Sequence, residues 1–148
     1  MELDDLKGRS GEPTSTTIDP ARVHEYVRAV GDTNPAYPQA PDDAEGKVAP
    51  PAFAAVYALF AGGGAMASMG IPPNRLIHGE QAFSWKRPLK VGETVTAQGS
   101  IVDVYRKRSL QFVEAEVVVR DSTETEVCRS KATILVLPDP NEAAEADA

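Results

Sequence analysis

The side chains of this chain that could carry out acid–base chemistry are concentrated in one segment, Gly31-Asp32-Thr33-Asn34-Pro35-Ala36-Tyr37. Asp32 supplies a carboxylate, Asn34 an amide and Tyr37 a phenol. A phenol with an ordinary pKa of about 10 is a poor base at neutral pH, so proton transfer here would rest on the carboxylate. Asp32 is therefore a candidate catalytic residue, and Asn34 is a candidate substrate contact beside it. The same pattern also builds turns in which the aspartate binds backbone N–H groups.

The two histidines, His24 and His78, are the other candidate bases. Imidazole is the commonest base at neutral pH, and His78 is followed closely by Glu80, a carboxylate that could orient it. A catalytic His78–Glu80 pair therefore stays open beside a structural role for this segment. His24 falls on the polar side of a predicted helix and is expected in solvent. Neither histidine has neighbours in sequence that would complete a metal site, so no metal and no cofactor is predicted.

Length and composition predict one soluble globular domain. The chain has 148 residues, 42% of them hydrophobic and 25% charged, with a formal net charge of −7. Residues 1–137 form the predicted domain, and residues 138–148 form an acidic tail that is expected to be disordered. The acidic balance argues against a nucleic-acid partner. The sequence shows no signal peptide and no membrane span, so a cytoplasmic protein is expected.

The single cysteine, Cys128, excludes an internal disulfide and fits a reducing compartment. It lies in a segment that reads as a strand, with no histidine nearby in sequence. We therefore expect a packed thiol, not a nucleophile.

The first half of the chain predicts a short strand and two helices. Residues 14–18 are rich in β-branched residues and predict the strand. Asp19 and Pro20 mark a helix start, and Gly31 marks its end. The apolar face of that helix is formed by Val23, Tyr26, Val27 and Val30.

A long proline-rich loop over residues 32–51 leads to a second helix over residues 52–69. This helix is apolar on nearly all sides, which predicts that other elements wrap around it. Its run Gly62-Gly63-Gly64 lowers its intrinsic stability and leaves open a break into two pieces.

The second half of the chain predicts four long strands. Val113, Ala115, Val117 and Val119 alternate with polar residues and should share one buried face. One buried helix followed by antiparallel strands indicates an α+β architecture. The predicted strands cover residues 76–85, 94–105, 110–120 and 126–135.

Four motifs in order resemble the MaoC-like superfamily, and within it the amino-terminal, FAS1-like dehydratase half. The resemblance covers roughly residues 5–137 and implies a hotdog fold, a curved antiparallel sheet wrapped around one long central helix. The motifs are Tyr26-x4-Gly31-Asp32-x-Asn34-Pro35, Val48-Ala49-Pro50-Pro51-x-Phe53, His78-Gly79-Glu80-Gln81 and Arg87-Pro88-Leu89-x-Val91-Gly92-Glu93.

Two departures from the catalytic pattern stand within these motifs. In catalytic members of the family that this chain resembles, the first motif continues as Asp-x-Asn-Pro-x-His. Here Tyr37 occupies the position of that histidine. Catalytic members also begin the central helix with His-Gly, whose glycine N–H polarises the thioester carbonyl. Pro50 and Pro51 stand there instead, and proline has no N–H to donate.

The resemblance therefore implies a subunit of a (3R)-hydroxyacyl-ACP or hydroxyacyl-CoA dehydratase that completes the acyl tunnel and supports a catalytic MaoC-like partner. The alternatives are a self-sufficient homodimeric dehydratase or thioesterase and a non-catalytic module that binds acyl thioesters. Tyr37 is either a packing residue or a hydroxyl donor at a dimer interface. The residues expected to line the acyl site are Tyr37, Pro51, Phe53, Tyr57 and Phe60.

Two basic groups stand out in this acidic chain. They are either solvated strand ends or contacts for the phosphates of CoA or for an acidic acyl carrier. For the second group, a hairpin tip, solvation is the better explanation. The residues are Lys86, Arg87 and Lys90, and then Arg106, Lys107 and Arg108.

Overall fold

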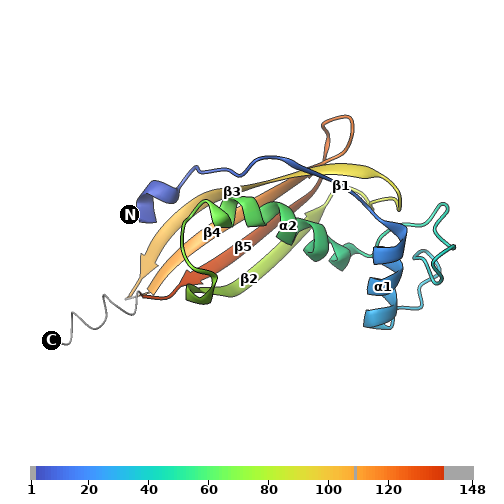
Figure 1. Cartoon of the computed structure of the whole chain (residues 1–148), viewed down its shortest axis with the longest axis horizontal. Helices are drawn as coiled ribbons and strands as arrows, with labels where there is room; N and C mark the ends of the chain where they lie inside the picture. Colours follow the sequence, from blue (N-terminus) through green and yellow to red (C-terminus); the bar gives the residue numbers. More distant parts are fainter. Residues whose placement is uncertain (1–2, 109, 139–148) are drawn as a thin grey trace.

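The computed structural model describes residues 3–108 and 110–138 as one antiparallel sheet with helices on one side (Figure 1). The predicted acidic tail lies almost entirely outside these residues. The helical elements are η1 (Leu3–Leu6), α1 (Pro20–Val30), η2 (Pro51–Phe53), α2 (Ala54–Ala67) and η3 (Pro73–Arg75). The strands are β1 (Thr14–Thr17), β2 (Leu76–Trp85), β3 (Thr94–Lys107), β4 (Leu110–Arg120) and β5 (Glu126–Val136).

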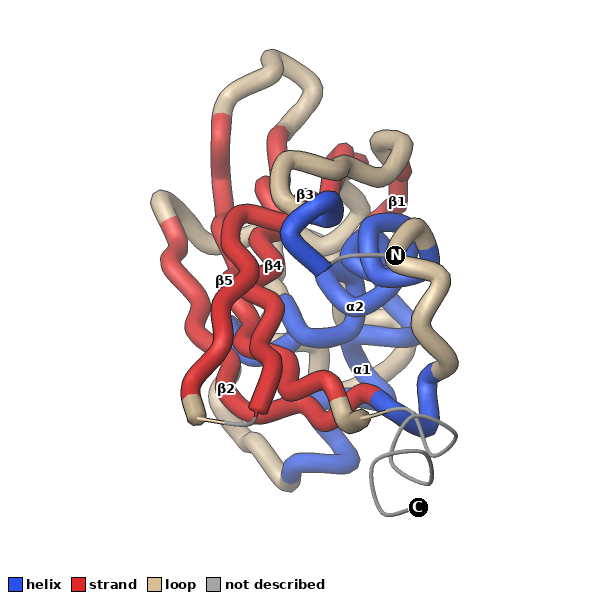
Figure 2. The backbone as a smooth tube through the Cα atoms, turned by 90° about the vertical axis from the view of Figure 1, so that its left-hand side faces the viewer, coloured by secondary structure: helices blue, strands red, loops and turns tan. Residues whose placement is uncertain are grey.

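The sheet has the order β1-β3-β4-β5-β2, and every neighbouring pair is antiparallel. Strands β3, β4 and β5 lie side by side because short turns connect them. Strand β2 pairs with the other edge of β5. Figure 2 shows the strands as one curved layer with α1 and α2 on the same side of it. The α+β hotdog architecture expected from the sequence is confirmed.

The core lies between this sheet and α2. The alternating residues Val113, Ala115, Val117 and Val119 are all buried, as their period of two predicts. Tyr57 and Ala54 on α2, together with Phe53 just before it, belong to the same core cluster as Val117 and Val119. A second cluster of buried residues around Met69, Ile101 and Ile134 forms the rest of the core.

Helix α1 has the boundaries expected from its caps. The Asp19 carboxylate accepts a hydrogen bond from the Arg22 N–H at 2.9 Å, and Gly31 ends the helix with φ 69°. Its predicted apolar face is correct for Val23 and Val27 but wrong for Val30, which is 54% exposed because it lies in the last turn beyond the core. His24 is also not freely solvated, since its ring is partly buried and Nδ1 lies 3.4 Å from the Pro38 carbonyl oxygen.

Helix α2 begins two residues later than expected, after the 3-10 turn η2, and it continues unbroken through its glycines. Its wrapping is incomplete: among the helix residues whose side chains are described, Ala54, Tyr57 and Ala65 are buried, whereas Gly64 and Ala67 are exposed. The residues before β1 pass close to this helix. A Cβ on Gly11 would lie 2.8 Å from the Ala65 nitrogen, so two backbones cross here in direct contact.

Candidate functional site

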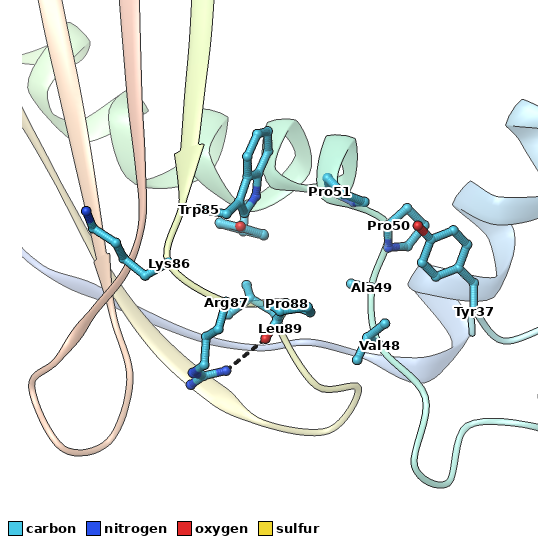
Figure 3. A pocket seen from close by; sticks show the side chains of 11 residues that line it. Tyr37, Val48, Ala49, Pro50, Pro51, Trp85, Lys86, Arg87, Pro88 and Leu89 are labelled. Carbon is cyan, nitrogen blue, oxygen red and sulfur yellow. Dashed lines mark hydrogen bonds between the residues drawn. The ribbon is translucent and has the colours of Figure 1, made fainter. Parts of the chain in front are cut away.

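A pocket of about 320 Å³ opens at the start of α2, between the long loop and the end of β2. In Figure 3 the Tyr37 ring lies beside Pro50, Trp85 stands on the opposite side of the opening, and Lys86 extends away from it. Aromatic, proline and aliphatic side chains dominate the wall. The lining residues are Tyr37, Val48, Ala49, Pro50, Pro51, Tyr57, Trp85, Lys86, Arg87, Pro88 and Leu89.

The long loop reaches this place because backbone hydrogen bonds attach it to the turn after β2. The Ala49 N–H donates to the Leu89 carbonyl at 2.9 Å, and the Val91 N–H donates to the Lys47 carbonyl at 3.0 Å. Val48 also forms an isolated bridge with Lys90. Two motifs that are far apart in sequence, around Pro50 and around Pro88, therefore form adjacent walls of one pocket.

The turn that carries Pro88 is held by Arg87. Its guanidinium donates to both carboxylate oxygens of Glu93 at 2.9 Å and to Asp121 at 3.2 Å. These hydrogen bonds raise the pKa of Arg87 further above its usual range, Glu93 contributing most. Glu93 also accepts the Lys90 N–H at 2.7 Å. Arg87 therefore shapes the pocket wall with a charge that carboxylates already neutralise.

Tyr57 lines the pocket and is only 5% exposed. Cys128 and Trp85 are polar neighbours of its hydroxyl. Burial, first of all, raises the pKa of the Tyr57 phenol far above its ordinary value. Burial likewise raises the pKa of the Cys128 thiol. This cysteine is buried, as expected, and its environment opposes the reactive thiolate.

Asp32 and Asn34 build a turn. The Asp32 carboxylate accepts the Asn34 N–H at 2.8 Å, and the Asn34 side-chain oxygen accepts the Ala36 N–H at 3.0 Å. Asp32 lines a different pocket, of about 250 Å³, beside His24. The structure therefore does not bring Asp32 and Tyr37 into one pocket, although they are close in sequence.

His78 and Glu80 lie on β2, exposed and away from the first pocket. The His78 Nε2 is 3.0 Å from the Gln81 side-chain oxygen, and the Gln81 amide donates to the Ser130 hydroxyl at 2.6 Å. A β-bulge separates His78 from Glu80. The side chain that orients His78 is thus Gln81, which the sequence reasoning did not single out.

Three of the five predicted lining residues, Tyr37, Pro51 and Tyr57, meet in the first pocket. Phe53 lines a second pocket, and the side chain of Phe60 lies outside the described residues. Sequence reasoning missed Trp85 and Leu89 as lining residues. The signal was present, since Trp85 immediately precedes the Lys86-Arg87-Pro88-Leu89 stretch whose motif had been recognised.

The pocket lining contains no aspartate, glutamate or histidine among the described residues. The described part of the chain also contains no group of three or more His, Cys, Asp or Glu side chains that could hold a metal ion. None of the described helices has the length and apolar character that a membrane span requires.

Comparison with known proteins agrees with this architecture. Residues 5–130 match the model of the FAS1-like, dehydratase domain region family. The chain belongs to this family and has the MaoC-like hotdog fold. It is similar to a UPF0336 protein of Streptomyces coelicolor, with 34% identity over 113 residues that cover 68% of this chain and 73% of the relative.

Two solved structures from Mycobacterium tuberculosis share the fold. One is a chain of the C-terminally truncated HadBC (3R-hydroxyacyl-ACP dehydratase) complex, with a TM-score of 0.73, 18% identity, and coverage of 88% of this chain and 97% of that chain. The other is a chain of the ChsH1–ChsH2 complex, with a TM-score of 0.71, 21% identity, and coverage of 93% and 94%.

Proposed function

We propose that this chain is the supporting subunit of a (3R)-hydroxyacyl-thioester dehydratase or enoyl-thioester hydratase. Its pocket would hold part of the acyl group, while a catalytic MaoC-like partner subunit supplies the aspartate and the histidine. The observation that carries the proposal is the pocket at the start of α2, which is apolar, contains Pro51 at the helix start and has no carboxylate or imidazole in its described lining.

The catalytic groups that this pocket lacks are the ones that the partner subunit would have to supply. Adding or removing water across the C2–C3 bond of a thioester needs a base near the α-proton and a donor for the thioester oxygen. At the position of the base this chain has Tyr37, a phenol. At the position of the donor it has Pro51, which has no N–H. The pocket would therefore bind and orient the acyl chain and exclude water from it.

Assembly with a partner is supported by the structural relatives, two of which are chains of the HadBC and ChsH1–ChsH2 complexes. One of the two edge strands of the described sheet, β2, carries the exposed apolar residues Ile77 and Trp85. Trp85 also lines the pocket, so a subunit that covered this edge would border the acyl site.

The test is hydration of crotonyl-CoA and of a long-chain enoyl-CoA, followed by loss of the enoyl-thioester absorbance. The purified protein is measured alone and co-expressed with a MaoC-like subunit that carries the Asp-x-Asn-Pro-x-His motif. Activity in the pair alone, retained in Asp32→Ala, is the expected result. Activity of the isolated chain that disappears in Asp32→Ala or His78→Ala would identify it as the enzyme itself. Acyl-thioester binding without turnover in either preparation would identify a binding module.

A further inference from the structure

One side chain separates two pockets in the helix layer. The first pocket, of about 320 Å³, lies on the side of Pro51 and Trp85. The second, of about 230 Å³, lies between β1 and the start of α2, against Phe53, Val56 and Ala97. Among the described residues, Tyr57 alone belongs to both linings.

Tyr57 is held in this position from several directions. Its side chain is 5% exposed and packs in the core cluster with Cys128 on β5. Its ring meets the Phe53 ring edge-on, with centroids 6.2 Å apart. A ring packed on several sides in the core has little rotameric freedom, so it acts as a fixed wall.

The floor of the second pocket suits an alkyl chain. Phe53, Ala97 and Ile18 are buried apolar residues, and Val56 is half-buried beside them. The polar side chains of this pocket, among them Asp19 and Thr16, come from β1 and the start of α1. The charged side chains of this lining, Asp19 and Arg22, belong to the start of α1, so the surface available to an apolar group is the one that Phe53, Val56 and Ala97 form.

We propose that Tyr57 is the specificity-determining residue that sets the acyl-chain length this subunit accepts. A short acyl chain fills the first pocket and ends at the ring. A longer chain is excluded from the second pocket while the ring stays in place. This inference rests on the proposed function, because it assumes that the first pocket receives an acyl group.

The decisive variant is Tyr57→Leu, which removes the ring and its hydroxyl but keeps an apolar side chain for packing. Tyr57→Phe retains the ring and is expected to leave the length preference unchanged. Adding Val56→Phe to Tyr57→Leu should refill the second pocket. Tyr105→Leu is the matched control, since Tyr105 stacks on Phe112 and lines neither pocket.

Binding of butanoyl-CoA, octanoyl-CoA and hexadecanoyl-CoA is measured for the full chain, alone and with its partner subunit. Each methylene that moves from water to apolar surface improves affinity by about fourfold. The ratio of hexadecanoyl-CoA to butanoyl-CoA affinity should therefore rise at least about tenfold in Tyr57→Leu, and Val56→Phe should reverse the gain. An unchanged ratio in a folded Tyr57→Leu protein would overturn the inference.

A second readout separates this inference from the proposed function. Apolar cavities take up xenon, so crystals under xenon pressure report the space directly. Tyr57→Leu should gain a xenon site between the two pockets that the wild type lacks. If the wild type binds no acyl thioester, either alone or with its partner subunit, the proposed function fails. The xenon experiment alone then decides whether Tyr57 separates the two pockets. No new xenon site in Tyr57→Leu would contradict that role.

Discussion

Arg87 and Glu93 are joined by two parallel hydrogen bonds, each 2.9 Å long, that close the turn between β2 and β3. The same guanidinium reaches Asp121 in the β4–β5 hairpin at 3.2 Å. One side chain thus links the pocket wall to a hairpin that is distant in sequence. The planar fork of arginine is what permits three carboxylate contacts at once.

Arg87→Ala should lower the free energy of unfolding by about 1–2 kcal/mol, because bonds to charged groups are strong but partial exposure screens them. Arg87→Lys should recover only part of the loss, since an ammonium cannot make the bidentate contact. Urea unfolding measures both. Arg106→Ala, at the exposed end of β3, is the control and should change little. Equal stability of Arg87→Ala and the wild type would contradict the linking role.

Asp121 should make the stability depend on pH in the acid range. Hydrogen bonds from Thr123 above all, and then from Arg87, lower its carboxyl pKa from 3.8 to about 2. A lowered native pKa stabilises the fold above the unfolded-state value, and the contribution is lost as the pH falls toward 2. Wild type should exceed Asp121→Asn in stability by a constant amount above about pH 4 and converge with it below. Thermal unfolding from pH 2 to 6 measures this, and a gap that persists at pH 2 would refute it.

Gly11 and Gly64 offer a matched pair of substitutions at the crossing of the amino-terminal segment over α2. A Cβ on Gly11 would lie 2.8 Å from the Ala65 nitrogen, whereas a Cβ on Gly64 would lie 3.7 Å from the Gly11 Cα, an ordinary contact. Gly11→Ala should therefore destabilise the protein by about 1–3 kcal/mol through overpacking. Gly64→Ala should stabilise it by about 0.5–1 kcal/mol through helix propensity. Chemical denaturation compares them, and equal effects of the same sign would contradict this geometry.

Cys128 should be unreactive in the folded protein. The residue is 0% exposed, and burial raises the pKa of its thiol. Labelling by dithionitrobenzoate at pH 8 should follow the rate of unfolding and become fast only in denaturant. Ser122→Cys places a thiol in the exposed β4–β5 turn and should react at once, as a reference. Rapid labelling of native Cys128 would show that the core opens locally.

Restoring the family's histidine should not restore catalysis. In Tyr37→His the imidazole would line the pocket at α2, while Asp32 lines another pocket and already accepts the Asn34 N–H. Pro51 still supplies no N–H for the thioester oxygen. The purified variant should therefore show no crotonyl-CoA hydration above that of the wild type. Measurable turnover would show that the loop rearranges to bring the two side chains together.

Several local features could be read from the amino-acid order because neighbouring residues determine them. Asp19, Pro20 and Gly31 gave the bounds of α1, since capping involves only adjacent backbone groups. The period-two pattern of β4 predicted its buried face correctly. The motifs also indicated the fold family, three of them at turns or a helix start and one, His78-Gly79-Glu80-Gln81, on strand β2.

The composition of the pocket could be predicted only in part. Pro51 and Tyr57 lie close in sequence on one helix start, so their proximity was predictable, but Trp85 and Leu89 joined them through backbone pairing between distant segments. The glycines of α2 suggested a break by propensity alone. In the structure the helix is unbroken, and the segment around Gly11 passes it in close contact.

The sequence by itself determined the family, the strand and helix order, and the absence of a histidine and a glycine at two positions that catalytic relatives use. Those properties are residue identities and short-range patterns. Only the tertiary structure decided that Asp32 and Tyr37 line different pockets, that Gln81 orients His78, and that Tyr57 stands between two pockets. Such relationships depend on where the sheet and loops bring distant side chains, and no local pattern encodes that position.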